Sequence, residues 1–438
     1  MQTAPALTGS EPAPGPRDLP PDEVPFDNRN FWAWVAYQFF YRIGWQFKME
    51  STLMAGIISY LTPDPRLMGL FTTLNNVGRN LAPLVAAPLV DRFARKRRAL
   101  MLFWIATVAV WAGLTLYLWL PVSANRALSI WVFGACYTLF FVLLGAATVA
   151  QGALLGKVIP ANMRGRAMAV GMTISGGINV CAILLIYQVI RSGRFPEPRN
   201  YALSFTLTTG FFAVAALSLL FIREEPSEVA RRSFHPGESF KTFIKLGREN
   251  PNLARLLLVN ISVGICGSML QFYTGYARRS GILTESFVVL ATVFQVFWQS
   301  LSCSIFGRIA DRRGNRAVII WMLWIEAIVP LSALVLGGWE PFRSQWIWYL
   351  GVYTLVGLRF PLYQLLVNYL LEVVPQREHA MAIGATTTVQ LVTAAAPILL
   401  GTVASVWGYP AAFVVASGVG FYGAVTALSM EEVRPGLA

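Results

Sequence analysis

The segment GRIADRRGNR at Gly307–Arg316 decides the fold of this chain. The segment APLVDRFARK at Ala87–Lys96 repeats it: both copies carry Asp-Arg followed by further basic residues, with alanine in place of the two glycines in the earlier copy. Each copy is short and polar and joins two long apolar runs. Farther out, Ile159-Pro160 followed by AMAVG recurs as Val374-Pro375 followed by AMAIG. Two echoes in the same order indicate a chain built of two related halves.

The composition of the whole chain is typical of a membrane protein. Of its 438 residues, 55% are hydrophobic and only 13% are charged, and the mean hydropathy is +0.54. Soluble domains carry about 25% charged residues, because their surface has to be covered by groups that water tolerates. These values exclude an ordinary soluble enzyme, a disulfide scaffold and a disordered chain. We therefore interpret the chain as an integral membrane protein.

About twelve apolar runs are long enough to cross a bilayer, which takes roughly 20 residues at a rise of ~1.5 Å per residue. Within hydrocarbon, every backbone polar group has to be paired inside its own segment, and the runs are too long for barrel strands, so we expect helices. The predicted fold is an all-α integral membrane protein with twelve transmembrane helices in two pseudo-symmetric six-helix bundles. The expected spans are Asn30–Leu61, Leu67–Val90, Ala99–Leu120, Ala127–Leu155, Arg166–Ile190, Tyr201–Ile222, Leu253–Tyr276, Glu285–Phe306, Arg316–Leu336, Trp346–Leu371, Ala380–Val406 and Ala411–Ser429.

The runs divide the chain into five regions. Residues 1–29 are rich in proline and are expected to form a disordered cytoplasmic tail, residues 30–222 and 252–430 the two six-helix bundles, and residues 431–438 a cytoplasmic C-terminal tail. The linker, residues 223–251, joins the bundles. In its stretch Ser239–Arg248, three apolar side chains share one face, which indicates a short amphipathic helix at the membrane interface; a solvated turn is the alternative.

Most of the 35 Lys and Arg residues fall in the loops on one side of the predicted spans. Cytoplasmic loops carry an excess of Lys and Arg, so this bias predicts a multi-pass protein of the inner (plasma) membrane with both termini in the cytoplasm. The same bias explains most of the formal net charge of +13 without a nucleic-acid partner.

No pattern points to a metal, a cofactor or catalytic chemistry. The four cysteines lie singly inside apolar runs, and both histidines lie in polar connections, so neither a zinc site nor a disulfide framework is expected. A nucleophile beside a base is not found, and neither is the phosphate-binding loop of an ATP-driven pump. We therefore predict that the chain is not an enzyme.

The twelve runs, the repeated halves and the two loop motifs together resemble the major facilitator superfamily, whose loop signature is roughly G-x-L-a-D-R-x-G-R-R. This resemblance covers nearly all of the chain after the tail. It implies a transporter that binds its substrate between the two bundles and rocks one bundle against the other. It also implies a gating role for the motif residues; the alternative is that the arginines only anchor the topology. The gating residues would be Asp91, Arg92, Gly307, Asp311, Arg312 and Gly314.

Two arginines lie near the centre of their spans, where an ionised side chain costs at least ~2.5–3.5 kcal/mol to insert. Arg79 lies in the second span with Asn76 nearby, and Arg359 lies in the tenth span with Tyr363 and Gln364 nearby. We predict that these residues line a substrate site, because an arginine fork grips a carboxylate or phosphate with two hydrogen bonds. The alternative is that both arginines form buried ion pairs that only fix the packing.

Two glutamates are the candidates for proton coupling, namely Glu50 and Glu326. On a continuous helix, Glu50 would complete a stripe with Arg42 and Gln46 that can line a cavity, and Lys48 would point to the other side. Glu50 is interpreted as a proton site or as the partner of an arginine. Glu326 lies in the ninth span, which is peripheral in the resembled fold.

These residues predict a secondary transporter that works by alternating access on a small organic or inorganic anion. If the two glutamates instead neutralise Arg79 and Arg359, a proton-coupled carrier of a sugar, another polar solute or a drug is favoured, with Gln271 among the hydrogen-bonding groups. A third hypothesis is a protein of the same fold that transports nothing and acts as a scaffold or delivery partner. The identity of the substrate, the direction of transport, the coupling ion and the oligomeric state are left open by the sequence.

Overall fold

The computed structural model describes residues 26–160, 163, 170, 195–226, 250–374 and 390–432, without the side chains of residues 285, 286 and 311. The residues in these ranges are helical with short connections and contain no strand. Most of the predicted tail, the predicted fifth span, most of the linker with its amphipathic stretch, the start of the predicted eleventh span and residues 433–438 lie outside these ranges.

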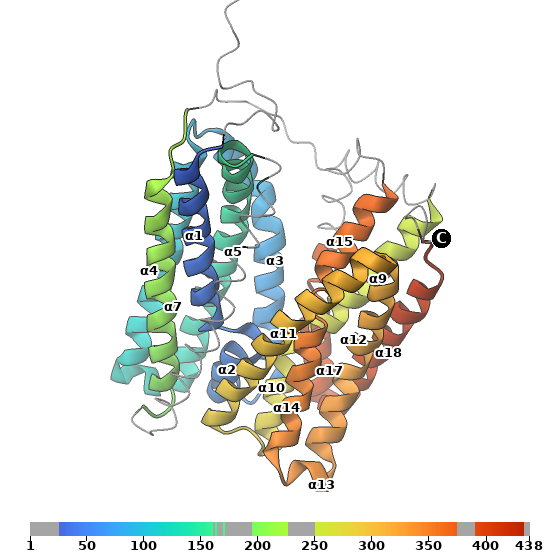
Figure 1. The fold of residues 1–438 in the computed structure, drawn as a ribbon. Coiled ribbons are helices and arrows are strands. Elements are labelled where there is room, and N and C mark those ends of the chain that lie inside the picture. The colour runs from blue at the N-terminus through green and yellow to red at the C-terminus, as the bar shows by residue number, and fades with distance from the viewer. Residues whose placement is uncertain are drawn as a thin grey trace, which may run out of the picture.

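The first half contains the predicted spans one to four and six (Figure 1). Span one is divided into two α-helices by a non-helical turn and a short π-helix. The elements are α1 (Asn28–Gln46), η1 (Glu50–Met54), α2 (Ala55–Leu61), α3 (Pro65–Asp91), α4 (Lys96–Trp119), η2 (Pro121–Ala124), α5 (Arg126–Val158), α7 (Arg199–Ser218) and η3 (Leu219–Phe221).

The second half repeats this plan from the seventh span onward. Its elements are α9 (Pro251–Gly267), α10 (Leu270–Arg279), α11 (Glu285–Arg313), α12 (Asn315–Gly338), α13 (Glu340–Arg343), η4 (Trp346–Tyr349), α14 (Leu350–Leu358), α15 (Leu362–Val373), α17 (Ala396–Trp407) and α18 (Tyr409–Leu428).

Nine helical segments among the described residues are long and apolar enough to cross a membrane, judged by length and composition. They correspond to the predicted spans three, four and six to twelve. The first two predicted spans are helical as well, but span one is broken, and Asn75, Asn76, Arg79 and Asn80 make span two more polar.

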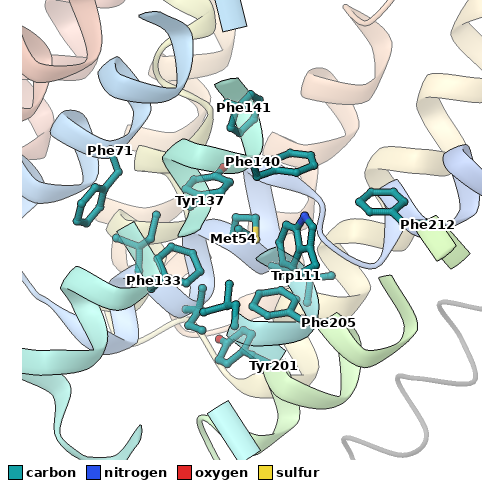
Figure 2. Close-up of a cluster of buried hydrophobic side chains, with 14 of the residues drawn as sticks. Met54, Phe71, Trp111, Phe133, Tyr137, Phe140, Phe141, Tyr201, Phe205 and Phe212 are labelled. Atoms are coloured by element: carbon teal, nitrogen blue, oxygen red, sulfur yellow. The ribbon is translucent and has the colours of Figure 1, made fainter. Parts of the chain in front are cut away.

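Aromatic side chains fill the core of the first half (Figure 2). Trp111 of α4 lies edge-on to Phe140 of α5 and to Phe205 of α7, with ring centroids 5.4 and 5.0 Å apart, and all three side chains are buried. Such pairs contribute about 0.5–1.5 kcal/mol each beyond the area they bury. The cluster therefore holds α4, α5 and α7 together as a rigid wall.

Matching hydrogen bonds close both halves at the face where α1 begins and α18 ends, which we call the basic face. An asparagine at the start of the first helix of each half accepts from a backbone N–H just after the last helix of that half. An arginine at the start of each third span donates to a backbone carbonyl near the same point. The pairs are Asn30 with Arg223 (2.7 Å), Asn252 with Glu431 (3.0 Å), Arg97 with Ile222 (2.6 Å) and Arg316 with Leu428 (2.9 Å).

The two halves meet toward the other face of the molecule, which we call the opposite face. There α3 packs against α17, and α2 and η1 pack against α10. The helices α2 and α10 lie next to each other in the lower part of Figure 1. A Cβ on Gly69 would lie 2.3 Å from the carbonyl oxygen of Pro397, and one on Gly401 would lie 2.6 Å from that of Pro65. Only glycine permits this approach of two backbones.

Toward the basic face the halves diverge (Figure 1), and Val85 on α3 is 72% exposed. All hydrogen bonds between the described residues of the two halves lie between mid-depth and the opposite face. The described parts of the two halves are therefore in contact at the opposite face and separated at the basic face.

Candidate functional site

Four of the predicted spans are interrupted within the residues that the structure describes. Interrupted helices expose backbone carbonyls and N–H groups, and in a membrane such backbone occurs only where protein buries it or where it lines a water-filled cavity. These breaks therefore mark the candidate site. They lie between α1 and η1 (Gln46 to Glu50), between α9 and α10 (Gly267 to Leu270), between α14 and α15 (Leu358 to Leu362) and at Ala394 and Ala395, just before α17.

Only one of these breaks was predicted from the sequence. Pro361, which lacks a backbone N–H, predicts a bend in the tenth span, and α15 begins at the next residue. The break in the seventh span follows Gly267, a weaker signal. No proline or glycine lies between Gln46 and Glu50, so the break in span one had no local signal.

The break in span one brings Lys48 and Glu50 together. Lys48 is fully buried; its Nζ donates to the Glu50 carboxylate and lies 3.5 Å from the ring centroid of Trp45 and 4.5 Å from that of Phe140. The expectation that Glu50 continues the helical stripe of Gln46, with Lys48 on the other side, is wrong, because the helix ends at Gln46 and the turn that follows redirects Lys48. The carboxylate and the two ring faces together compensate the buried ammonium.

Arg359 forms a second buried ion pair, with Glu326 of α12. The distance from Nη1 to Oε2 is 2.5 Å, and the two side chains are 13% and 3% exposed. The pair lies inside the second half, beside the break between α14 and α15. Of the two alternatives that the sequence left open for Arg359, the structure shows the ion pair; a role in substrate binding stays a prediction.

Two arginines at mid-depth form no ion pair among the described residues, Arg42 on α1 and Arg79 on α3. Arg42 is half-buried, its Nε has no hydrogen-bond partner, and it lies within electrostatic range of Cys303 on α11 of the other half. Arg79 is exposed and lies two turns from Thr72, which donates to Gln271 of the other half at 2.8 Å. Residues seven apart share a helix face, so Arg79 lies on the same face of α3 as Thr72, toward the other half. The nearness of Cys303 places Arg42 on the side of α1 toward the other half.

Polar side chains join the two halves between these arginines and the opposite face. Gln271, predicted from the sequence, accepts from Thr72 and donates to Tyr137 of α5 at 3.3 Å. The hydroxyl groups of η1 were not predicted, because serine and threonine are too frequent in the spans to single any out. Their contacts are Ser51 with Gln295, Thr52 with Thr292 (2.5 Å) and the Ser51 carbonyl with Thr274 (2.5 Å).

The other predicted binding residues lie around this centre. Gln46 is buried with its Oε1 unpartnered, and Asn76 is half-buried on α3. Tyr363 is 49% exposed and Gln364 donates to Asn368 at 3.0 Å; both lie on the face of α15 that points away from α9 and α12.

The predicted gating residues lie at the basic face, and no described contact of theirs joins the halves. Asp91 pairs with Lys96 at 3.5 Å within its own loop, and Arg92 and Arg312 are exposed. Gly307 has open space around it, whereas Gly314 has φ +84° and turns the chain from α11 into α12. The side chain of Asp311 lies outside the described residues.

One ion pair among the described residues joins the two halves, and it lies at the opposite face. Arg278, at the end of α10, binds Glu197 with an Nη2–Oε1 distance of 2.6 Å and donates from Nε to Ser59 of α2 at 3.0 Å. The Glu197 carboxylate also accepts from Tyr201 at 3.1 Å. Because its members belong to both halves, this pair can exist only while the opposite face is closed.

Breaking this pair is expected to open the opposite face. Arg278→Gln and Glu197→Gln each remove a charge-assisted contact of the closed state only, so the population shifts toward the state open at that face. In a chain without its native cysteines, Ser51→Cys supplies a buried reporter (Ser51 is 1% exposed), and its alkylation from the opposite face is expected to become several-fold faster.

The exchange of the two charges, Arg278→Glu with Glu197→Arg, is expected to restore slow alkylation. Arg343→Gln is the control, because it breaks an exposed pair with Glu340 inside one half. Alkylation as slow as in the parent chain in both single variants would contradict the assignment.

The comparisons with known proteins agree with this geometry. The sequence profile described as Major Facilitator Superfamily matches residues 37–392. Among curated proteins, none matches the sequence significantly. The fold is similar to that of a D-xylose-proton symporter, with 13% identity over 92% of this chain and 98% of that one and a TM-score of 0.67.

Two further solved structures show the same fold. One is the xylose transporter XylE from E. coli in an inward open conformation, with 12% identity, coverage of 92% and 97%, and a TM-score of 0.65. The other is the nucleoside transporter NupG, with 15% identity, coverage of 92% and 99%, and a TM-score of 0.62. At these identities the likeness shows the fold alone.

The chain belongs to the Major Facilitator Superfamily, as its loop motifs predicted. The predicted class, an all-α membrane protein of two related six-helix bundles, is confirmed by the family match and by the fold of the similar structures. It is a multi-pass membrane protein of a transporter family.

Proposed function

We propose that this chain is a secondary active transporter that works by alternating access on a small solute carrying negative charge. The observation that carries this proposal is the pair of arginines, Arg42 and Arg79, that face the space between the halves without an acidic partner among the described residues.

A count of the charges at mid-depth supports an anionic substrate. Glu50 is compensated by Lys48 and Glu326 by Arg359, so each of these pairs is close to neutral. Arg42 and Arg79 are left over, and a guanidinium is always protonated. An anion bound by the two guanidinium groups would compensate their positive charges, which are otherwise costly at this depth.

The closed opposite face and the separated basic face support an inward-facing state of the transporter. The bias of Lys and Arg places the basic face in the cytoplasm. With that orientation the structure represents the inward-facing state, and the protein lies in the inner (plasma) membrane with both termini inside. The motif carboxylates Asp91 and Asp311 then act as gates in the outward-facing state, when the basic face closes and brings the two halves together.

A proton-coupled carrier of a neutral polar solute is the second candidate. The amide and hydroxyl groups of Gln271, Gln295 and Ser51 favour it, because they suit hydroxyl-rich substrates. Glu50 would then take up the proton, and its ion pair with Lys48 would break. A D-xylose-proton symporter is among the structures of similar fold.

Thermal unfolding of the purified protein separates the two candidates. Small organic and inorganic anions are expected to raise the melting temperature of the wild type, because a ligand that binds the folded state stabilises it. Arg79→Gln is expected to lose this shift, and Arg98→Gln, at an exposed position at the start of α4, is expected to keep it. Stabilisation by neutral sugars or nucleosides and by no anion would overturn the anionic substrate and favour the second candidate.

Deletion of residues 1–25 tests whether the fold serves transport or scaffolding. A transporter holds its substrate between the bundles, so the truncated protein in proteoliposomes is expected to keep the flux of the full chain. Loss of cellular activity with unchanged flux would favour the scaffold hypothesis, in which the tail recruits a partner.

A further inference from the structure

A groove lies on the outer surface of the first half, outside the space between the halves. It has a volume of about 670 Å³ and lies between α1 and α7. Its walls are mostly apolar, and its polar residues lie at one end. The lining residues are Asn28, Arg29, Trp32, Ala33, Ala36, Phe40, Val214, Leu217, Ser218 and Phe221.

The groove runs along the membrane normal from the basic face inward. On α1 it extends from Asn28 to Phe40, twelve residues, which is about 18 Å at ~1.5 Å per residue. One leaflet contributes about half of the ~30 Å hydrocarbon core. On η3 and α7 it extends from Phe221 at the basic face to Val214 deeper in the membrane. The groove therefore has the depth and the direction of one lipid acyl chain.

Its cross-section is set by residue size. Ala33 and Ala36 are small, whereas Trp32, Leu217 and Phe221 rise beside them and are 54%, 56% and 61% exposed. Small residues next to large ones leave a channel open to the bilayer. Trp32 is close to the end of α1, at the level where indole rings meet lipid headgroups.

Basic groups surround the polar end. The Arg29 Nε donates to the Phe221 carbonyl at 2.8 Å, which holds the guanidinium across the mouth of the groove. Arg97 donates to the carbonyl of Ile222, and Arg223 is exposed next to it. Three arginines thus lie around the end of η3, just after α7.

Three described acidic groups lie nearby, namely Asp27, Glu224 and Glu225; two of them accept hydrogen bonds, and Glu225 is exposed. Asp27 accepts from the backbone N–H of Arg29 at 2.8 Å, as the cap of α1. Glu224 is bound by the backbone N–H groups of Lys96 and Arg97, at 2.7 Å each, and by the Lys157 ammonium. With Lys96 and Lys157, five basic residues stand against these three acids, so the mouth of the groove carries a net positive charge.

We infer that this groove binds an anionic phospholipid of the leaflet at the basic face, with the phosphate on Arg29 and one acyl chain along Ala33 and Ala36. The inference is independent of the transported solute, because it rests on a surface outside the space between the halves. An anionic headgroup fits better than a zwitterionic one, since each basic residue at an anionic surface is worth about 1 kcal/mol.

Native mass spectrometry of the delipidated full-length protein, titrated with dioleoyl-phosphatidylglycerol or dioleoyl-phosphatidylcholine, tests the inference. The wild type is expected to retain phosphatidylglycerol preferentially. Arg29→Gln is expected to weaken that binding about fivefold, the factor that corresponds to ~1 kcal/mol. Ala36→Trp, which fills the floor of the groove, is expected to remove the tightest lipid of either kind.

Two matched variants serve as controls. Arg308→Gln removes an exposed charge at the basic face of the other half, and Ala109→Trp adds the same ring at an exposed position of α4; both are expected to bind lipid as the wild type does. Equal retention of the two lipids, or wild-type binding by both groove variants, would overturn the inference. Loss of a co-purifying protein from Ala36→Trp with lipid binding unchanged would assign the groove to that protein and also overturn it.

Discussion

Arg359→Leu is expected to destabilise the folded protein severely. Glu326 is 3% exposed, and this substitution would leave its carboxylate buried without the guanidinium 2.5 Å away. Removal of one partner of a buried ion pair typically costs about 3–5 kcal/mol, because the remaining charge stays desolvated. Replacement of both partners by apolar side chains is often neutral. Arg359→Leu with Glu326→Leu is therefore expected to unfold close to the wild-type temperature.

Thermal unfolding of the single and double variants in the same detergent gives the coupling between the two positions. Arg308→Leu, at an exposed position on α11, controls for the loss of an arginine as such. An Arg359→Leu protein as stable as the wild type would refute the argument.

Transport by the double variant then separates the two roles proposed for the pair. Flux at the wild-type level would assign Arg359 and Glu326 to packing alone. A stable double variant without flux would support the predicted roles in substrate binding and proton coupling.

Gly401→Val is expected to block transport while leaving the protein folded. A Cβ at this position would lie 2.6 Å from the carbonyl oxygen of Pro65, a backbone atom that cannot rotate away. The two residues belong to different halves, so the clash arises only when the opposite face is closed. Overpacking of this kind costs roughly 1–3 kcal/mol, which is about fivefold to a hundredfold in the population of the closed state.

The Ser51→Cys reporter and flux in proteoliposomes measure this effect together. In Gly401→Val, we expect faster alkylation from the opposite face and slower flux. Gly418→Val is the matched control, since nothing lies within 4 Å of the corresponding Cβ on α18. Wild-type flux and alkylation in Gly401→Val would show that the contact does not limit closure.

The fold was predictable because its main signals are local. Each span is an apolar run long enough to cross the hydrocarbon, and each satisfies its own backbone, so spans are recognised one by one. The loop motifs at Ala87–Lys96 and Gly307–Arg316 predicted the family. The directions of the side chains in span one were harder to predict, because no proline or glycine signals the break after Gln46.

The candidate site was predictable only as a set of unusual residues. Charge at mid-depth singled out Glu50, Arg79, Glu326 and Arg359. The hydroxyl group of Ser51 was not singled out, since nothing in a single sequence distinguishes it from other small polar side chains in the spans.

By itself, the sequence determined the apolar runs, their division into two related halves and the side on which basic loops gather, because each of these depends on residues that are neighbours in the chain. Only the tertiary structure decided that Lys48 forms the ion pair with Glu50, that Glu326 pairs with Arg359, and that Arg42 and Arg79 have no acidic partner among the described residues. The physical reason is that several cations lie at similar depths and the strength of an ion pair depends on distance and burial. Which pairs form follows from the helix faces that meet and from where a helix breaks.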